Sequence, residues 1–243
     1  MTTDNPLSYV GSELDLFSQA NNWRSYWSSI IYKYLRGSVL EVGAGIGTNT
    51  KKLQSSATHW TALEPDPTQC LRIEDWIGKS QITTVQVKTG TLVNLPDDVL
   101  YNAILYIDVL EHIADDASEI QSAYAHLSPG GKLIVLSPAH EFLYTPFDKS
   151  IGHFRRYNKS NLLKIKPYHA TTEFIGYLDS AGLLASLGNK ILLKKSMPTM
   201  RQIKFWDNLL VPISSKLDRV FNYRLGKSIL AVWQKPLNPF RNF

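Results

Sequence analysis

Three histidines in the middle of the chain are candidates for moving protons. His112 lies in DVLEHI, His140 in SPAH and His153 in IGHFRRY. Imidazole accepts a proton near neutral pH more readily than other side chains, so each is a candidate catalytic base. Each also has a structural alternative, because His112 could cap a helix or shape a pocket and His140 could be an ordinary loop residue. The sequence leaves the choice among the three open.

An arginine pair directly follows His153 in the stretch FRRY. The planar guanidinium group presents paired donors that suit a carboxylate or a phosphate, which predicts an anionic group on the substrate. The alternative is that the pair anchors its own segment through salt bridges to Asp148 or Glu141. The predicted substrate contacts are Tyr144, Arg155, Arg156 and Tyr157.

No metal site is predicted from the residue spacing. The chain has no H-E-x-x-H pattern, and the neighbours Glu111 and His112 are too close to supply two ligands from one helix face. Cys70 is the single cysteine, so the chain cannot form an internal disulfide. Its place in an amphipathic stretch predicts a packing role.

Three glycines alternate in SVLEVGAGIGTNT, directly after a short apolar run. Gly43, Gly45 and Gly47 read G-x-G-x-G, whereas a dinucleotide site needs G-x-G-x-x-G, and position 48 is Thr. Glycine still lets the backbone approach a ligand closely. Glu64 ends the next apolar run, where a carboxylate accepts hydrogen bonds from ribose hydroxyls. The pattern predicts a nucleoside site and disfavours a nicotinamide dehydrogenase.

Apolar runs of strand length alternate with helical stretches between residues 38 and 138. The runs are SVLEV, HWTALE, TTVQV, YNAILYID and KLIVLS, separated by stretches such as PTQCLRIEDWIG. This alternation predicts a doubly wound, mostly parallel α/β sheet with helices on both faces. Strand candidates at ATTEFIGYLDS and SILAVWQ bring the expected sheet to seven strands.

We expect a single domain over residues 1–243. Residues 1–37 are predicted to form an N-terminal helical segment, and residues 38–138 the cofactor-binding half. Residues 139–243 are expected to supply a substrate cap after the fifth strand, a basic helical insertion from about 182 to 223, and the final strands. Pro146 and Pro167 favour loop structure in the cap.

Three segments in this order, VLEVGAGIGTNT, ALEPD and ILYIDVLEHIADD, resemble the signature segments of class I, Rossmann-like methyltransferases that use S-adenosylmethionine. The resemblance implies that the glycine turn lies against the methionine part of the cofactor, that Glu64 holds the ribose, and that S-adenosylhomocysteine is the product. The residues implied to bind the cofactor are Glu41, Gly43, Ala44, Gly45, Gly47, Glu64, Pro65, Gly90, Thr91, Asp108, Val109 and Leu110.

A second pair of segments, SPAHEFLYTPFDKSIGHFRRYNKSNL and GKSILAVWQKP, is similar to a bacterial branch of these methyltransferases often found among glycan-modifying or lipid-modifying enzymes. The resemblance implies oxygen methylation of a small molecule or of a glycan or lipid precursor. Methylation of RNA or protein is one alternative, and a non-catalytic binding protein on the same fold is another. No recognisable RNA-binding module supports the first alternative.

The positive charge of the chain is concentrated near its C-terminus. Residues 188–243 contain 11 Lys and Arg against two Asp, although the whole chain has a net charge of only +5. Aromatic residues are interspersed, which predicts contact with phosphates or with a peripheral membrane surface. A solvated face is the alternative. The sequence has no signal peptide and no apolar stretch of spanning length, so we expect a cytoplasmic protein.

Overall fold

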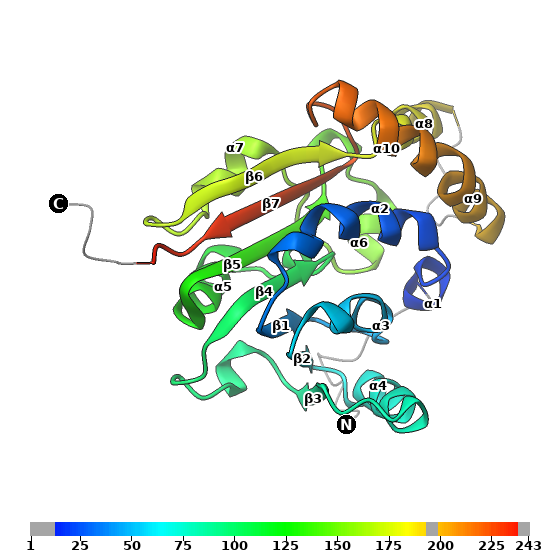
Figure 1. Cartoon of the computed structure of the whole chain (residues 1–243). Helices are drawn as coiled ribbons and strands as arrows, with labels where there is room; N and C mark the ends of the chain where they lie inside the picture. The colour runs from blue at the N-terminus through cyan, green and yellow to red at the C-terminus, as the bar shows by residue number, and fades with distance from the viewer. Residues whose placement is uncertain (1–12, 193–198, 238–243) are drawn as a thin grey trace, which may run out of the picture.

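A seven-stranded sheet forms the centre of the molecule (Figure 1). The computed structural model describes residues 13–192 and 199–237. The strands are β1 (Ser38–Val42), β2 (His59–Glu64), β3 (Val85–Thr89), β4 (Tyr101–Ile107), β5 (Leu127–Pro138), β6 (Thr171–Leu178) and β7 (Ser228–Gln234). Their order is β3-β2-β1-β4-β5-β7-β6, and β7 runs antiparallel to both of its neighbours. The predicted mostly parallel, seven-stranded α/β sheet is confirmed.

The central strands are buried on both faces. In β4, Ala103, Leu105 and Ile107 pack on one side of the sheet, and Ile104 and Tyr106 on the other. Strands sandwiched in this way are apolar throughout, which is why their sequences read as continuous runs rather than as alternating patterns. Because β1, β2, β4 and β5 are parallel, their carboxyl ends meet at one edge of the sheet.

Helices cover both faces of the sheet (Figure 1). The α-helices are α1 (Glu13–Phe17), α2 (Asn21–Ile31), α3 (Thr48–Leu53), α4 (Pro67–Ser80), α5 (Asp116–Ala125), α6 (Pro146–Ser150), α7 (Lys159–Lys164), α8 (Ser180–Leu192), α9 (Met200–Phe205) and α10 (Val211–Val220). Several begin at side chains that accept a backbone N–H of the first turn, among them Asp66 before α4 and Asn158 before α7. Within the described ranges, none is long and apolar enough to cross a bilayer.

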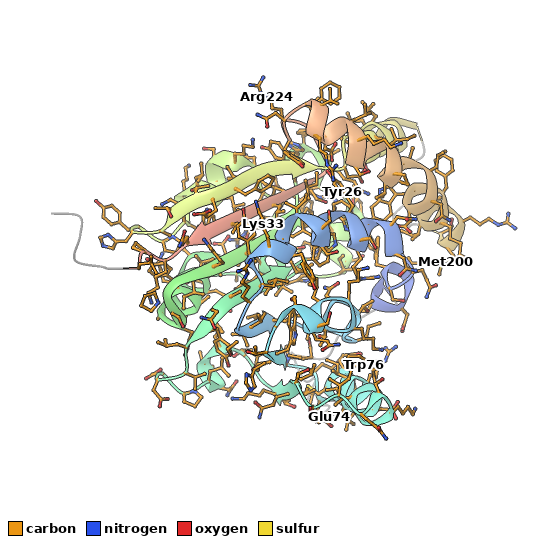
Figure 2. The ribbon with its side chains drawn as sticks, viewed as in Figure 1. Tyr26, Lys33, Glu74, Trp76, Met200 and Arg224 are labelled. Atoms are coloured by element: carbon orange, nitrogen blue, oxygen red, sulfur yellow. The ribbon has the colours of Figure 1, made fainter. Side chains whose placement is uncertain are left out.

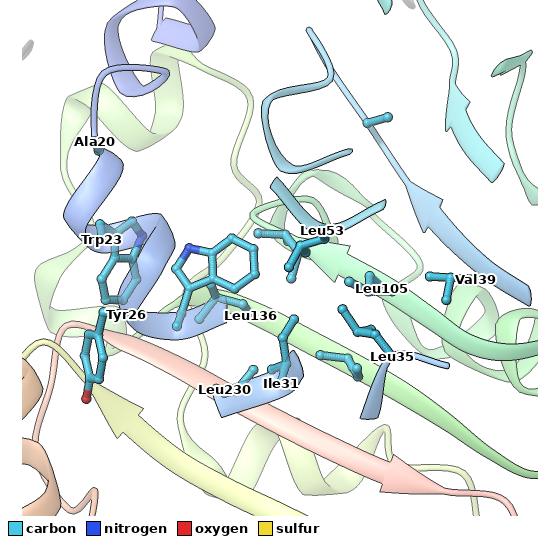
Figure 3. Packing of buried hydrophobic residues seen from close by; sticks show 14 of the residues in the cluster. Ala20, Trp23, Tyr26, Ile31, Leu35, Val39, Leu53, Leu105, Leu136 and Leu230 are labelled. Carbon is cyan, nitrogen blue, oxygen red and sulfur yellow. The ribbon is translucent and has the colours of Figure 1, made fainter. Parts of the chain in front are cut away.

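Two apolar clusters, one on each face, form the core. Figure 3 shows part of the larger one, in which Trp23 and Ile31 of α2 belong to the same cluster as Leu136 of β5 and Leu230 of β7, with Ile31 next to Leu230. The opposite cluster joins α5 and α7 to the sheet and includes Ile120, Leu162 and the buried ring of Trp233. Helix α2 of the predicted N-terminal helical segment is therefore part of the core.

The predicted helical insertion before the last strand consists of α8, α9 and α10. Between α9 and α10 the helix widens into a π-helical turn, Trp206–Leu210. Pro212 follows this turn, and because proline has no N–H it cannot complete the regular bonding pattern there. The cap region, expected to be mainly loop, contains the short helices α6 and α7.

Buried carboxylates fasten this insertion to the rest of the fold. Asp218 of α10 accepts hydrogen bonds from the Tyr26 hydroxyl of α2 (2.7 Å) and from the backbone N–H groups of Asp179 (2.6 Å) and Ser180 (3.0 Å). Asp207 of the π-helical turn accepts the N–H groups of Asn22 and Trp23 at the start of α2. That helix has no side-chain cap of its own, so the insertion supplies one.

We expect Asp218→Ala to lower the free energy of unfolding by about 3 kcal/mol, since three buried donors lose their acceptor. Urea denaturation followed by circular dichroism measures the change. Asp75→Ala serves as the control, because Asp75 forms an exposed ion pair with Lys79 within α4, and we expect no measurable change there. Equal stabilities for the two variants would contradict the role assigned to Asp218.

Candidate active site

A cavity of about 1430 Å³ opens at the carboxyl edge of the parallel strands. Its walls come from the glycine turn after β1, the loops after β2, β3 and β4, the cap around α6, and helices α1, α2, α8 and α9. Ligands of open α/β sheets bind at this edge. Of the predicted cofactor residues, the cavity is lined by Gly43, Ala44, Gly45, Glu64, Pro65, Gly90, Thr91, Asp108 and Val109.

The glycine turn has a backbone shape that other residues rarely adopt. Gly43, Gly45 and Gly47 all have positive φ angles, between 54° and 74°. A Cβ atom on Gly43 would lie 2.6 Å from the Val109 side chain, so a larger residue would push apart the turns after β1 and β4. The turn therefore holds these two loops close together at the cavity wall.

Glu64 connects the glycine turn to the loop after β2. Its carboxylate accepts the N–H of Gly45 at 2.7 Å and the N–H of Asp66 at 3.0 Å. Burial raises the pKa of Glu64, while these two backbone donors lower it. Each oxygen retains a free lone pair, so the carboxylate can also accept hydrogen bonds from a ribose. These residues fit a nucleoside cofactor.

Three predicted cofactor residues lie outside the cavity lining: Glu41, Gly47 and Leu110. Glu41 is buried below the turn, where one of its oxygens accepts hydrogen bonds from Thr50 and Trp60. Burial raises the pKa of Glu41 to about 7. Gly47 packs against Ile73 instead. The structure thus gives these residues supporting positions behind the wall.

The loop after β4 carries an unusual backbone and a carboxylate. Asp108 has a φ of 55° and donates its N–H to Leu136. Its side chain is open to the cavity, yet the surrounding protein raises its pKa to about 6, an effect that His153 and Lys227 partly oppose. Strain of this kind is common at functional sites.

Glu111, His112 and His153 line the same cavity as Asp108. Their ligand atoms all lie within 4.8 Å of one another, and the two imidazole rings meet edge to face with centroids 4.5 Å apart. Burial and the nearby His153 lower the pKa of His112 to about 4, so its ring is neutral at physiological pH. We call these three residues the Glu-His-His cluster.

A carboxylate of the cap contacts the ring nitrogen of His153 that faces away from Glu111. Asp148 contacts the Nδ1 atom of His153 at 3.0 Å and also receives two hydrogen bonds from the Arg156 guanidinium, at 2.9 and 3.0 Å. Burial alone would raise the pKa of Asp148, but the hydrogen bonds from His153 and Arg156 hold it well below its usual range. A charged Asp148 favours a proton on Nδ1 and leaves the other ring nitrogen for the cavity.

The arginine pair anchors the cap, as the alternative reading of FRRY proposed. Arg156 is bound to Asp148, and Arg155 forms an ion pair with Asp116 at 2.6 Å. Tyr157 is buried and donates its hydroxyl proton to Asp116. Arg156 reaches the cavity lining, whereas Arg155 and Tyr157 do not. Tyr144 lines the cavity and donates to the His153 carbonyl oxygen.

His140 is not brought to the cavity. Its Nε2 atom lies 3.0 Å from the carbonyl oxygen of Gly226, and its ring stacks on Phe142 and packs against Tyr177. Its position just after β5 suggested a place at the sheet edge, but a positive φ of 66° turns the residue away. Of the three candidate bases, the structure therefore places His112 and His153 at the cavity.

Several cavity residues were not found from the sequence. Trp23 of α2 and Trp206 of the π-helical turn lie against each other, and Lys227 lies 3.9 Å above the Trp206 ring. Glu111 was set aside because it adjoins His112 and both were expected on one helix. The structure instead places them in a 3-10 turn (Leu110–His112), with His153 supplied from 41 residues away.

Comparison with known proteins agrees with this geometry. A family model described as a methyltransferase domain matches residues 19–183. No curated protein sequence matches the chain. Among solved structures, an S-adenosylmethionine-dependent methyltransferase from Clostridium acetobutylicum is 11% identical, with a TM-score of 0.59, and the match covers 93% of this chain and 95% of that one.

Two further structures show how widely this fold is used. Phosphoethanolamine N-methyltransferase 2 from Haemonchus contortus, in complex with S-adenosyl-L-methionine, is 16% identical with a TM-score of 0.62, over 92% of this chain and 57% of that one. The [4+2]-cyclase SpnF is 14% identical with a TM-score of 0.63, over 94% and 95%. At these identities the likeness concerns the fold. The family match spans more than half of the sequence, so the chain belongs to the methyltransferase-domain family and is an S-adenosylmethionine-dependent methyltransferase.

Proposed function

We propose that the protein methylates an oxygen atom of a small, largely apolar acceptor. The observation that carries this proposal is the continuity of one cavity, which runs from the glycine turn to the Glu-His-His cluster. The cofactor end and a proton-handling end therefore share one space. Because the glycine turn allows close approach of a ligand and the cluster carries the histidines, we assign the cofactor to the glycine turn and the acceptor to the cluster.

The cofactor half would hold S-adenosylmethionine through backbone and carboxylate contacts. In this proposal Glu64 would accept the ribose hydroxyls, Gly90 and Thr91 would border the adenine, and the glycine turn would lie along the methionine part. Asp108 would orient the amino group of the cofactor. When bound, the cofactor supplies a methyl group already activated by its sulfonium, so the chain needs mainly to position the acceptor.

The cavity that contains the cluster is mostly apolar, and its lining includes Leu143, Phe147, Ile203, Trp206 and Leu210. An oxygen nucleophile must lose its proton as the new carbon–oxygen bond forms, and the cluster favours that loss. The two arginines are already engaged by carboxylates, so we propose an uncharged hydroxyl rather than the anionic acceptor that the arginine pair suggested.

The cavity lining also guides the choice among other substrates. RNA or protein methylation is the weaker alternative, because this cavity is lined mostly by apolar side chains and receives residues from both α1 and α9. The bacterial glycan-modifying and lipid-modifying branch fits an apolar acceptor end, and we keep it as part of the proposal. A non-catalytic binding protein would not need the proton-handling residues of the Glu-His-His cluster, so we disfavour that alternative.

The outer surface of the insertion suggests where such an acceptor is met. Five apolar side chains follow one side of α9, the π-helical turn and α10, each between 37% and 77% exposed. We call them the amphipathic face, and they are Phe205, Leu209, Ile213, Leu217 and Val220. Successive spacings of four, four, four and three residues keep them in one stripe. Exposed stripes of this kind mark interaction surfaces.

The charges around this face favour an anionic lipid surface as its partner. The exposed cations beside it are Arg201, Lys204, Lys216, Arg219 and Arg224, and Figure 2 labels Arg224 and Met200 toward the two ends of the segment. The only acidic residues of the segment, Asp207 and Asp218, are buried. Apolar side chains flanked by cations suit a membrane interface. Phe205 also lines the cavity, so an acceptor could enter from the membrane.

Replacing Glu64 with Ala should weaken binding of S-adenosylhomocysteine by about 1.5–3 kcal/mol, or roughly 10- to 100-fold, because charge-assisted bonds to the ribose are lost. Isothermal calorimetry measures the affinity, and circular dichroism checks the fold. Glu74→Ala, at an exposed position of α4 (Figure 2), is the control and should bind normally. An unchanged affinity in Glu64→Ala would refute the assignment of the ribose site.

The acceptor atom can be tested with three probes that share one apolar tail: para-octylphenol, para-octylaniline and para-octylbenzoic acid. With methyl-labelled S-adenosylmethionine, we expect the phenol to be methylated fastest, giving an ether that resists mild alkali. His153→Gln should slow this transfer by about 100-fold or more, and the exposed His59→Gln should not. Faster methylation of the aniline, or no transfer to any probe while S-adenosylhomocysteine still binds, would contradict the proposal.

Membrane contact predicts sedimentation with vesicles of phosphatidylcholine that contain about one third phosphatidylglycerol, and not with phosphatidylcholine alone. Leu209→Ser with Ile213→Ser should reduce the bound fraction several-fold, while Val93→Ser, which changes an exposed apolar residue after β3, should leave it unchanged. No binding at low salt would disprove the contact. Concentration-dependent dimerisation abolished by the same pair of substitutions would assign the face to a second copy of the chain instead.

A further inference from the structure

We propose that Glu111, His112 and His153 bind a divalent transition-metal cation at the acceptor end of the cavity. Two imidazoles and one carboxylate are the donors that Zn²⁺ and related first-row cations take, whereas Mg²⁺ and Ca²⁺ prefer sets made of oxygen. Within the described residues, these three are the group whose ligand atoms converge in this way. The binding stands on their geometry, and only its use in catalysis rests on the proposed function.

Glu111 is the first support for this site. The residue is completely buried, and neither carboxylate oxygen makes a hydrogen bond of regular geometry; the polar groups near it include the Ser137 hydroxyl and, at 3.9 Å, Nε2 of His153. A buried carboxylate with so few donors is costly, so native structures rarely keep one without a use.

His153 is the second support, because it is prepared in the way that metal-binding histidines are. Asp148 lies 3.0 Å from its Nδ1 atom, and a carboxylate behind the ring fixes which nitrogen carries the proton. The remaining Nε2 atom lies 3.9 Å from Oε1 of Glu111. Asp148 accepts hydrogen bonds from Arg156 and Thr145, so the orientation of the His153 ring is restrained.

The distances suit a small cation after a modest adjustment. Ligand atoms of a tetrahedral zinc site stand about 3.4 Å apart when each bond is about 2.1 Å. The three donor atoms lie within 4.8 Å, and the Glu111 to His153 separation is 3.9 Å. Three protein ligands that face a cavity leave a coordination position for another oxygen, which is the arrangement of reactive rather than structural sites.

The open position would give the cation a role in the proposed reaction. A hydroxyl bound there would ionise more readily and release its proton to solvent. The oxygen would then form the new bond to the methyl carbon, and the electron pair of the carbon–sulfur bond would go to sulfur. His112 and His153 would act as ligands, and Asp148 would position one of them.

The test uses the full chain after treatment with a chelator, and no acceptor is needed. We expect one Co²⁺ to bind per chain with visible absorption typical of nitrogen and oxygen ligands, and Zn²⁺ to displace it in calorimetry. Glu111→Gln and His153→Gln should each weaken binding at least tenfold, and Asp148→Asn by about 10- to 100-fold. His59→Gln, at an exposed histidine, is the matched control and should bind normally.

The outcomes separate this inference from the proposed function. Binding of S-adenosylhomocysteine shows in each variant that the fold is intact. No Co²⁺ binding, or binding that survives both Glu111→Gln and His153→Gln, overturns the metal site even if the phenol probe is methylated. Metal binding that depends on these residues supports the site even if the phenol probe is not methylated, and the proposed function alone would then fail.

Discussion

The cavity depends on a set of buried carboxylates that join the two ends of the chain. Asp207 caps α2 through the N–H groups of Asn22 and Trp23, and Asp218 receives the Tyr26 hydroxyl of the same helix. Asp179 in turn holds the Trp206 indole at 2.6 Å. Each of these acceptors is required, because a buried donor left without a partner costs more free energy than a hydrogen bond contributes on balance. Trp23 and Trp206, which both line the cavity, are held in place as a result.

This arrangement separates the two tasks of the site. The cofactor end is built on the parallel strands, whose turns are set by backbone hydrogen bonds and by glycines with positive φ. The acceptor end is built from α2, the cap and the insertion, which come from distant parts of the sequence. Helix α9 and the π-helical turn both line the cavity and carry part of the amphipathic face. The widened turn before Pro212 makes this possible, because it rotates Trp206 inward while Phe205 and Leu209 stay exposed.

The strands and the glycine turn could be predicted because their signals are local. A run such as YNAILYI, apolar at nearly every position, indicates a strand that is buried on both faces. Closely spaced glycines indicate a turn with positive φ angles. The Glu-His-His cluster could not be predicted in this way. Glu111 and His112 were treated as helix neighbours, and His153 is brought to them by long-range contacts of the cap, among them the hydrogen bond from the Phe154 N–H to the Glu111 carbonyl oxygen and the ion pair of Arg155 with Asp116. The role of Arg156 was likewise decided by a partner eight residues away, and sequence spacing alone could not choose between that partner and a substrate.

The environment of His153 is the strongest sign that the cluster does chemistry. Two carboxylates flank this ring, and their pKa values are shifted in opposite directions. Hydrogen bonds stabilise the charged form of Asp148, whereas burial destabilises the charged form of Glu111. Neighbouring acids whose pKa values are driven apart are typical of sites that move protons or hold cations. A purely structural cap would need only the Asp148 and Arg156 pair, and an apolar residue at position 111 would pack more cheaply. The retained carboxylate therefore points to a ligand that occupies the space between Glu111 and His153.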